Sequence, residues 1–220
     1  MAAHPPQAIT AVEPDPRRPG AVRLFVGGQL YCTVDESAAA GIAAGQPLGP
    51  PLADALGRAA DEEAAYRTIL RALHRRSHAR ADLARRLVRR GHAADAVEAA
   101  LGRAEQHGFL DDAAFATHYV QTRSQRGRGP ARLVRDLLAL GVARPLIDSA
   151  VTGQWPADAD PSAVPTALAA RRAAQMGDLP RPVKRRRLLA FLARRGFTGA
   201  DAMNAVREAF AGDRPDADRS

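Results

Sequence analysis

The sequence lacks the residues and motifs on which most catalytic and cofactor chemistry depends. Cys32 is the only cysteine in 220 residues, which excludes an intramolecular disulfide and a C4 or C2H2 zinc site. Lys184 follows Pro180-Arg181-Pro182-Val183 where a P-loop for ATP would have glycines, and no G-x-x-x-x-G-K-[ST] segment occurs elsewhere. H-E-x-x-H and G-x-S-x-G are also absent. We therefore expect a protein that is not an enzyme and has no catalytic residues, cofactor or metal.

Long hydrophobic runs and aromatic residues are scarce. No stretch approaches eighteen uninterrupted apolar residues, and the opening MAAHPPQ has neither a basic nor an apolar segment. These absences predict a cytoplasmic protein without membrane contact. Aromatic residues make up only 5% of the chain, whereas alanine and leucine dominate, which favours closely packed helices over an aromatic-rich β-sandwich.

A histidine pair is the one arrangement that suggests a metal. His74 and His78 are four residues apart. Ser77, however, is a favourable N-cap for a new helix that would begin between them, and the neighbouring arginines repel a cation. We interpret the pair as structural.

Lysine is nearly absent, yet the chain is basic. Lysine and arginine number 32 against 24 acidic residues, a net charge of +8 carried almost entirely by arginine. Residues 1–60 hold five acids and four bases, so the whole excess lies beyond residue 60. Arginine stays charged and binds phosphate or carboxylate through a bidentate fork. The excess predicts an anionic partner, which leaves both nucleic acid and an acidic protein open.

The first fifty residues differ from the rest. Scattered prolines predict a disordered tail over residues 1–20. Two apolar runs at residues 22–26 and 30–34 flank Gly27-Gly28-Gln29, which predicts a β-hairpin packed on a short helix at residues 35–44. We assign residues 21–51 to this hairpin module because a cluster of glycine and proline follows it.

From residue 52 onward the apolar spacing is helical and repeats. The pattern Leu-x-x-x-Leu-x-x-x-Gly occurs at residues 83–91, 133–141 and 188–196, with its glycines 50 and 55 residues apart. Glycine after an apolar stripe ends a helix, and a second short helix follows each one, with Val97, Ile147 or Met203 about one and a half turns on. The fold class is therefore mainly α, with three tandem three-helix (helix-turn-helix-like) repeats in a solenoid-like row. The predicted repeats are residues 52–107, 108–153 and 154–211, followed by a frayed tail at 212–220.

Arginines crowd all three repeats. Arg85 and Arg89 are four residues apart, as are Arg86 and Arg90, and both pairs lie off the apolar stripe. Like charges at this spacing destabilise an isolated helix by a few tenths of a kcal/mol, so their recurrence favours a binding surface. The candidate binding residues are Arg75, Arg76, Arg85, Arg86, Arg89, Arg90, Arg126, Arg128, Arg132, Arg186, Arg187 and Arg194.

Four segments between about residues 60 and 210 resemble the RecX family of regulatory proteins. The most specific is Gly108-Phe109-Leu110-Asp111-Asp112-x-x-Phe115-Ala116, which resembles the family's G-[YF]-[IL]-[DN]-D-x-x-[FY]-A. Arg80, Asp82 and Leu140 depart from the usual residues and affect cap strength and local charge. The other segments are Arg75-Arg76-Ser77 leading into Asp82-Leu83-x-x-x-Leu87, Gly127 and Gly129 followed by Leu133 to Gly141-Val142, and Arg194-Arg195-Gly196-Phe197.

The resemblance implies a curved repeat array that binds along the groove of the RecA–DNA filament. Such proteins limit filament growth, strand exchange and the ATP hydrolysis of RecA, and they bind DNA more weakly, through its phosphates. We expect a monomeric regulator whose guanidinium groups form one continuous track. A helix-turn-helix transcription regulator and a scaffold for another acidic protein stay open as alternatives. Also open are whether the protein caps filament ends or coats the groove, and what the hairpin module does.

Overall fold

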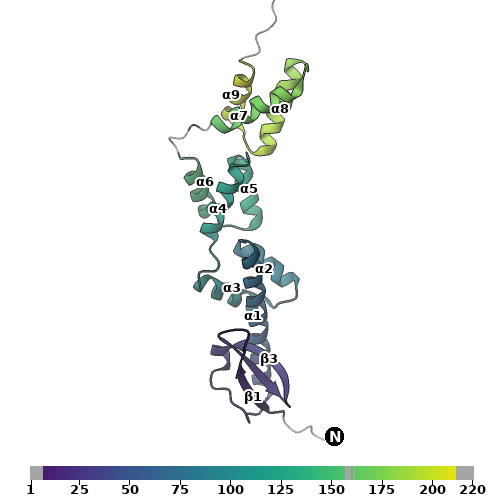
Figure 1. Cartoon of the computed structure of the whole chain (residues 1–220), viewed down its shortest axis with the longest axis vertical. Helices are drawn as coiled ribbons and strands as arrows, with labels where there is room; N and C mark the ends of the chain where they lie inside the picture. The colour runs from purple at the N-terminus through teal and green to yellow at the C-terminus, as the bar shows by residue number, and fades with distance from the viewer. Residues whose placement is uncertain (1–6, 157–159, 161, 212–220) are drawn as a thin grey trace, which may run out of the picture. The chain divides into compact units, whose positions relative to one another are not determined.

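The computed structural model describes residues 7–156, 160 and 162–211 (Figure 1). It divides into two compact units, Met1–Asp111 and Asp112–Ser220. The first unit contains a small β-sheet and one three-helix repeat, and the second contains two three-helix repeats. The predicted fold class, mainly α with tandem three-helix repeats, is confirmed. In the part of the chain that the structure describes, no helix combines the length and the apolar character needed to cross a membrane.

The N-terminal module is a three-stranded antiparallel sheet. β1 (Ile9–Pro14), β2 (Ala21–Val26) and β3 (Gln29–Asp35) pair in the order β1-β2-β3. The predicted hairpin of β2 and β3 is confirmed, with Gly27 and Gly28 at φ values of 57° and 79° in its tight turn.

The prediction of a disordered tail over residues 1–20 is wrong from residue 9 onward. Ile9 is buried in the sheet, and Pro14 ends an edge strand, where the missing N–H of proline is tolerated. Residues 1–6 lie outside the described part of the chain. The short helix predicted at 35–44 is a single 3-10 turn, η1 (Glu36–Ala39), and Gly41, two residues after its end, takes a left-handed φ of 78° that no helix can continue through.

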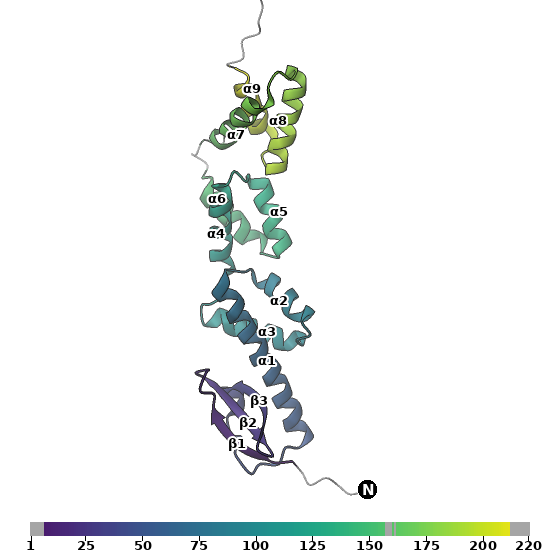
Figure 2. The ribbon, with the colours of Figure 1, turned by 45° about the vertical axis from the view of Figure 1, so that its right-hand side comes forward.

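Helix α1 (Pro50–Arg75) serves both the sheet and the first repeat (Figure 2). Its Leu56 is buried with the strands, and its Tyr66 and Ile69 are buried with α2 (Arg80–Arg89) and α3 (Ala94–Gln106). The module boundary predicted between residues 51 and 52 therefore falls inside one helix.

A buried ion-pair network joins β3, α1 and α3. The Arg103 guanidinium donates to the Glu63 carboxylate at 3.0 Å, lies 2.7 Å from the Asp35 carboxylate and stacks 3.9 Å from the centre of the Tyr66 ring. Glu63 is only 3% exposed. Because an unpaired buried carboxylate is costly, Arg103 stabilises the attachment of the sheet to the first repeat.

Ser77 is not the N-cap of α2, contrary to the prediction. That position is taken by Ala79, with no side-chain cap, and Ser77 is exposed. The helix begins later than expected because His78 and Ala79 turn inward and are buried at its start.

All three repeats end their second helix with the same backbone motif. Gly91 follows α2, Gly141 follows α5 (Pro130–Leu140) and Gly196 follows α8 (Arg181–Arg195), at φ values of 92°, 86° and 95°. In each, the N–H of the residue after glycine donates to the carbonyl five residues back, at 3.3, 3.1 and 3.0 Å respectively. This is the Schellman arrangement, which requires a left-handed residue and so favours glycine. The leucine–glycine repeat read from the sequence is confirmed.

The remaining helices complete repeats 2 and 3. Repeat 2 comprises α4 (Asp112–Ser124), α5 and α6 (Arg144–Gln154). Repeat 3 comprises α7 (Ala163–Ala173), extended by the 3-10 turn η2 (Ala174–Met176), then α8 and α9 (Gly199–Ala209). Val97 is buried as predicted and Ile147 is buried at the matching position, whereas Met203, matched to them in repeat 3, is 50% exposed. Ala202, six residues after its glycine like the other two, takes the buried place.

Candidate binding surface

Five guanidinium groups line one hollow in the second unit. Its volume is about 380 Å³. We call it the arginine hollow, defined by Arg126, Arg128, Arg132, Arg194 and Arg195. Arg126 and Arg128 lie in the segment after α4, and Arg132 lies in α5. Arg194 and Arg195 are the last two residues of α8. Residues from two repeats, about 65 positions apart in sequence, therefore form one strongly basic site.

Glycine permits the close backbone contact that assembles this hollow. The Gly129 N–H donates to the Arg195 carbonyl at 2.7 Å, and the Ala131 N–H donates to the Gly196 carbonyl at 3.3 Å. A Cβ added at Gly129 would lie 2.6 Å from backbone atoms of Gly196. The free carbonyls at the end of α8 thus meet the free N–H groups at the start of α5, where the opposite helix dipoles also attract.

One carboxylate orients two of the five arginines. Asp136 of α5 accepts hydrogen bonds from Arg128 at 2.5 Å and from Arg132 at 2.9 Å. Among the described residues, Arg126 and Arg194 have no carboxylate within 4.0 Å, and Arg195 donates to the backbone carbonyls of Arg126 and Gly127 instead. The hollow therefore keeps an excess of positive charge.

Repeat 3 lacks acidic partners more generally. Residues 162–211 contain ten basic and three acidic residues. Within that range, no basic side chain lies within 4.0 Å of a carboxylate of the described residues. A surface of uncompensated arginines repels itself and attracts anions.

Repeat 1 neutralises more of its positive charge internally. Asp82 lies 2.9 Å from Arg86 and 4.0 Å from Arg85. Burial alone would raise the pKa of Asp82, but the hydrogen bonds and charges of Arg86 and His78 together lower that pKa. Arg80 pairs with Glu98 and Glu105. The other four candidates of this repeat are exposed: Arg75, Arg76, Arg89 and Arg90.

The predicted site residues are thus brought together in part. Arg126, Arg128, Arg132 and Arg194 share the arginine hollow, and Arg187 lines a neighbouring hollow with Arg194. Arg186 is exposed on α8 and lines neither of these two hollows. The prediction missed Arg195, although this residue lies in the family-like segment Arg194-Arg195-Gly196-Phe197.

His74, His78 and Cys32, of residue types that could bind a metal, show no arrangement that would serve one among the described residues. His78 is buried 3.4 Å from the Asp82 carboxylate, whereas His74 is exposed. Burial, followed by the charge of Arg76, lowers the pKa of His78. Burial also raises the pKa of the Cys32 thiol. Within the described residues, no group of three or more His, Cys, Asp or Glu side chains is placed to hold a metal.

The fold and this surface define a class of protein, namely tandem three-helix repeats with a strongly basic surface. A family model described as "RecX, second three-helix domain" matches residues 111–151, which span α4 to α6. The regulatory protein RecX of Thermobifida fusca (strain YX) is 38% identical over 130 residues, covering 58% of this chain and 69% of the relative. That of Halorhodospira halophila (strain DSM 244 / SL1) is 38% identical over 131 residues, covering 58% and 76%.

Solved structures share the fold. A crystal structure of regulatory protein RecX matches with a TM-score of 0.73 and 21% identity, covering 92% of this chain and 99% of that one. The crystal structure of RecX from Lactobacillus salivarius matches with a TM-score of 0.59 and 17% identity, covering 68% and 96%. The chain belongs to the RecX family.

Proposed function

We propose that this protein binds the RecA filament on DNA and limits its growth, its strand exchange and its ATP hydrolysis, without catalysing a reaction itself. The observation that carries the proposal is the arginine hollow together with the acid-poor surface of repeat 3. A nucleoprotein filament presents both phosphates and carboxylates, and arginine binds either in a bidentate manner. Membership of a family whose relatives are named regulatory proteins supports the same conclusion.

We propose different roles for the individual arginines of the binding surface. Arg126 and Arg194 contact the filament directly, because both are exposed and lack a carboxylate partner among the described residues. Arg128 and Arg132 are held in place by Asp136 and widen the same site. In repeat 1, Arg89 and Arg90 extend the binding surface.

The test is the ATPase activity of RecA on single-stranded DNA. Adding the purified protein in several-fold molar excess should lower the turnover substantially. Unchanged turnover under these conditions would overturn the proposal. Because one chain carries its own arginine hollow, we expect a monomer in sedimentation. The proposed partner also places the protein in the cytoplasm.

A helix-turn-helix transcription regulator is the alternative that the sequence left open. Its basic residues would concentrate on one recognition helix, whereas here they occur in every repeat. The discriminating measurement is DNA binding with competitor DNA and rising salt. We expect weak binding that falls steeply with salt, as phosphate contacts do, and sequence-selective binding that survives competitor would favour the alternative.

A further inference from the structure

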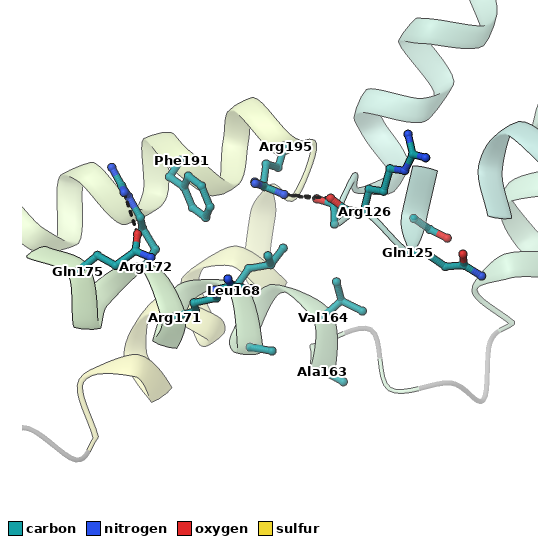
Figure 3. Close-up of a pocket in the computed structure, with 13 residues that line it drawn as sticks. Gln125, Arg126, Ala163, Val164, Leu168, Arg171, Arg172, Gln175, Phe191 and Arg195 are labelled. Carbon is teal, nitrogen blue, oxygen red and sulfur yellow. Dashed lines mark hydrogen bonds between the residues drawn. The ribbon is translucent and has the colours of Figure 1, made fainter. Parts of the chain in front are cut away.

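A second, larger cavity shares Arg126 and Arg195 with the arginine hollow but differs from it in chemistry. Figure 3 shows the residues that line it. Its volume is about 880 Å³, within the range of typical ligand sites. Helix α7 forms one wall, Phe191 and Arg195 of α8 form another, and residues 124–127 after α4 close one end. We call this cavity the α7–α8 cleft.

The side of α7 that faces the cleft is aliphatic. Val164, Ala167 and Leu168 line it, whereas Pro165 and Ala169 on the other side of the helix are buried. Val164 is 39% exposed although it lies in the first turn of a helix that packs in repeat 3. Leu168 is half-buried and also packs against the core of repeat 3, whereas Val164 and Ala167 are exposed, so the outer part of this aliphatic side is open to a ligand.

Arginines surround this aliphatic floor. Arg126, Arg171, Arg172 and Arg195 line the cleft, and none of the described residues that line it is acidic. Two of them are positioned by hydrogen bonds, Arg172 to the Gln175 side chain at 3.0 Å and Arg195 to the Arg126 carbonyl at 3.1 Å (Figure 3). An apolar surface with an exclusively basic rim complements a ligand that is apolar at its centre and acidic at its edges.

We propose that the α7–α8 cleft binds an acidic amphipathic segment of a partner protein. Aliphatic side chains of that segment cover Val164 and Leu168, and its carboxylates pair with Arg126, Arg171 and Arg172. This is the helix-in-groove mode, in which apolar anchors supply affinity and charges supply orientation. The site does not require RecA to be the partner, so it extends the proposed function without resting on it.

The lining disfavours nucleic acid as the occupant. Single-stranded nucleic acid is bound through bases stacked on aromatic rings. Among the described residues that line the cleft, Phe191 is the only aromatic one, and its ring already carries the guanidinium groups of Arg195 at 4.9 Å and Arg172 at 5.8 Å. An aliphatic floor offers bases no stacking surface, whereas it suits leucine or isoleucine side chains.

The test uses the full chain and a fluorescein-labelled probe peptide of fourteen residues. The probe has leucines at helical spacing, i, i+3, i+4 and i+7, and glutamate or aspartate elsewhere, and a matched probe replaces each leucine with serine. Fluorescence anisotropy should show the leucine probe binding at least tenfold more tightly. Val164→Glu and Arg171→Glu should each weaken binding of the leucine probe at least tenfold.

Matched variants outside the cleft provide the control. Met203→Glu also places a carboxylate at an exposed apolar position, and Arg207→Glu also reverses an exposed arginine. Both should bind within twofold of wild type, and circular dichroism should show all four variants folded. Equal binding of the two probes, or equal losses in cleft and control variants, would overturn the inference. Displacement of the probe by equimolar (dT)14 would also overturn it, by assigning the cleft to nucleic acid.

Discussion

Replacing Gly196 with alanine tests whether the backbone contact between α5 and α8 holds repeats 2 and 3 together. The new Cβ would lie 2.4 Å from the Arg132 backbone nitrogen, so the two helix ends must separate. The φ of 95° costs alanine about 1–2 kcal/mol by itself. Separation also breaks the hydrogen bonds donated by Gly129 and Ala131, worth about 1 kcal/mol each. We expect the free energy of unfolding to fall by about 3–4 kcal/mol.

Gly91→Ala is the matched control for this substitution. Gly91 has nearly the same φ, 92°, but a Cβ there would have no heavy atom within 4 Å. Only the conformational cost of about 1–2 kcal/mol should appear. Urea unfolding measures both variants, and hydrogen exchange with mass spectrometry should show faster exchange over residues 126–132 in Gly196→Ala alone. Equal destabilisation of the two variants, with residues 126–132 as protected as in wild type, would refute the reasoning.

Two further predictions concern the first unit. Arg103→Met should lower the free energy of unfolding by up to about 3–5 kcal/mol in urea titrations, because it removes the closer cation of the buried Glu63 carboxylate and leaves only Arg67, at 3.8 Å. Arg103→Met with Glu63→Met should recover most of that loss, and no recovery would contradict the ion-pair explanation. Because burial lowers the pKa of His78 below its usual 6.5, the unfolded state binds the proton more readily, and stability should decline as the pH falls through that value. His78→Gln should flatten this decline in unfolding measurements between about pH 7.5 and pH 5.5, and an unchanged slope would exclude His78 as its source.

Local patterns predicted the helical part of the fold well. The repeated Leu-x-x-x-Leu-x-x-x-Gly pattern identified the second helix of each repeat. Its glycine adopts a left-handed conformation because the Schellman motif that ends the helix requires one, and this requirement is local in sequence. The strand β1 was missed because nearby prolines outweighed the short apolar run around Ile9, whose role depends on pairing with β2. Ser77 was misassigned because burial of His78 and Ala79, a tertiary effect, delays the start of α2.

The candidate site was less accessible to sequence reasoning. Composition and spacing showed that arginine is in excess, but the partners of each arginine depend on the fold. Arg85 and Arg86 share Asp82 within one helix, whereas Arg126 and Arg194 come together only because Gly129 and Gly196 allow a long-range backbone contact. Glycines can be read in a sequence, but the close approach that requires them cannot.

The most direct test of the proposed function is a charge-matched titration of RecA ATPase activity. Arg126→Glu with Arg194→Glu reverses two exposed arginines of the hollow, and Arg144→Glu with Arg207→Glu reverses two exposed arginines elsewhere in the same unit. Both double variants have the same net charge, so general attraction to the filament is equal. We predict that the hollow variant needs about tenfold more protein for half-maximal inhibition, whereas the control stays near wild type. Equal half-inhibiting concentrations for the two variants would contradict the assignment of the arginine hollow.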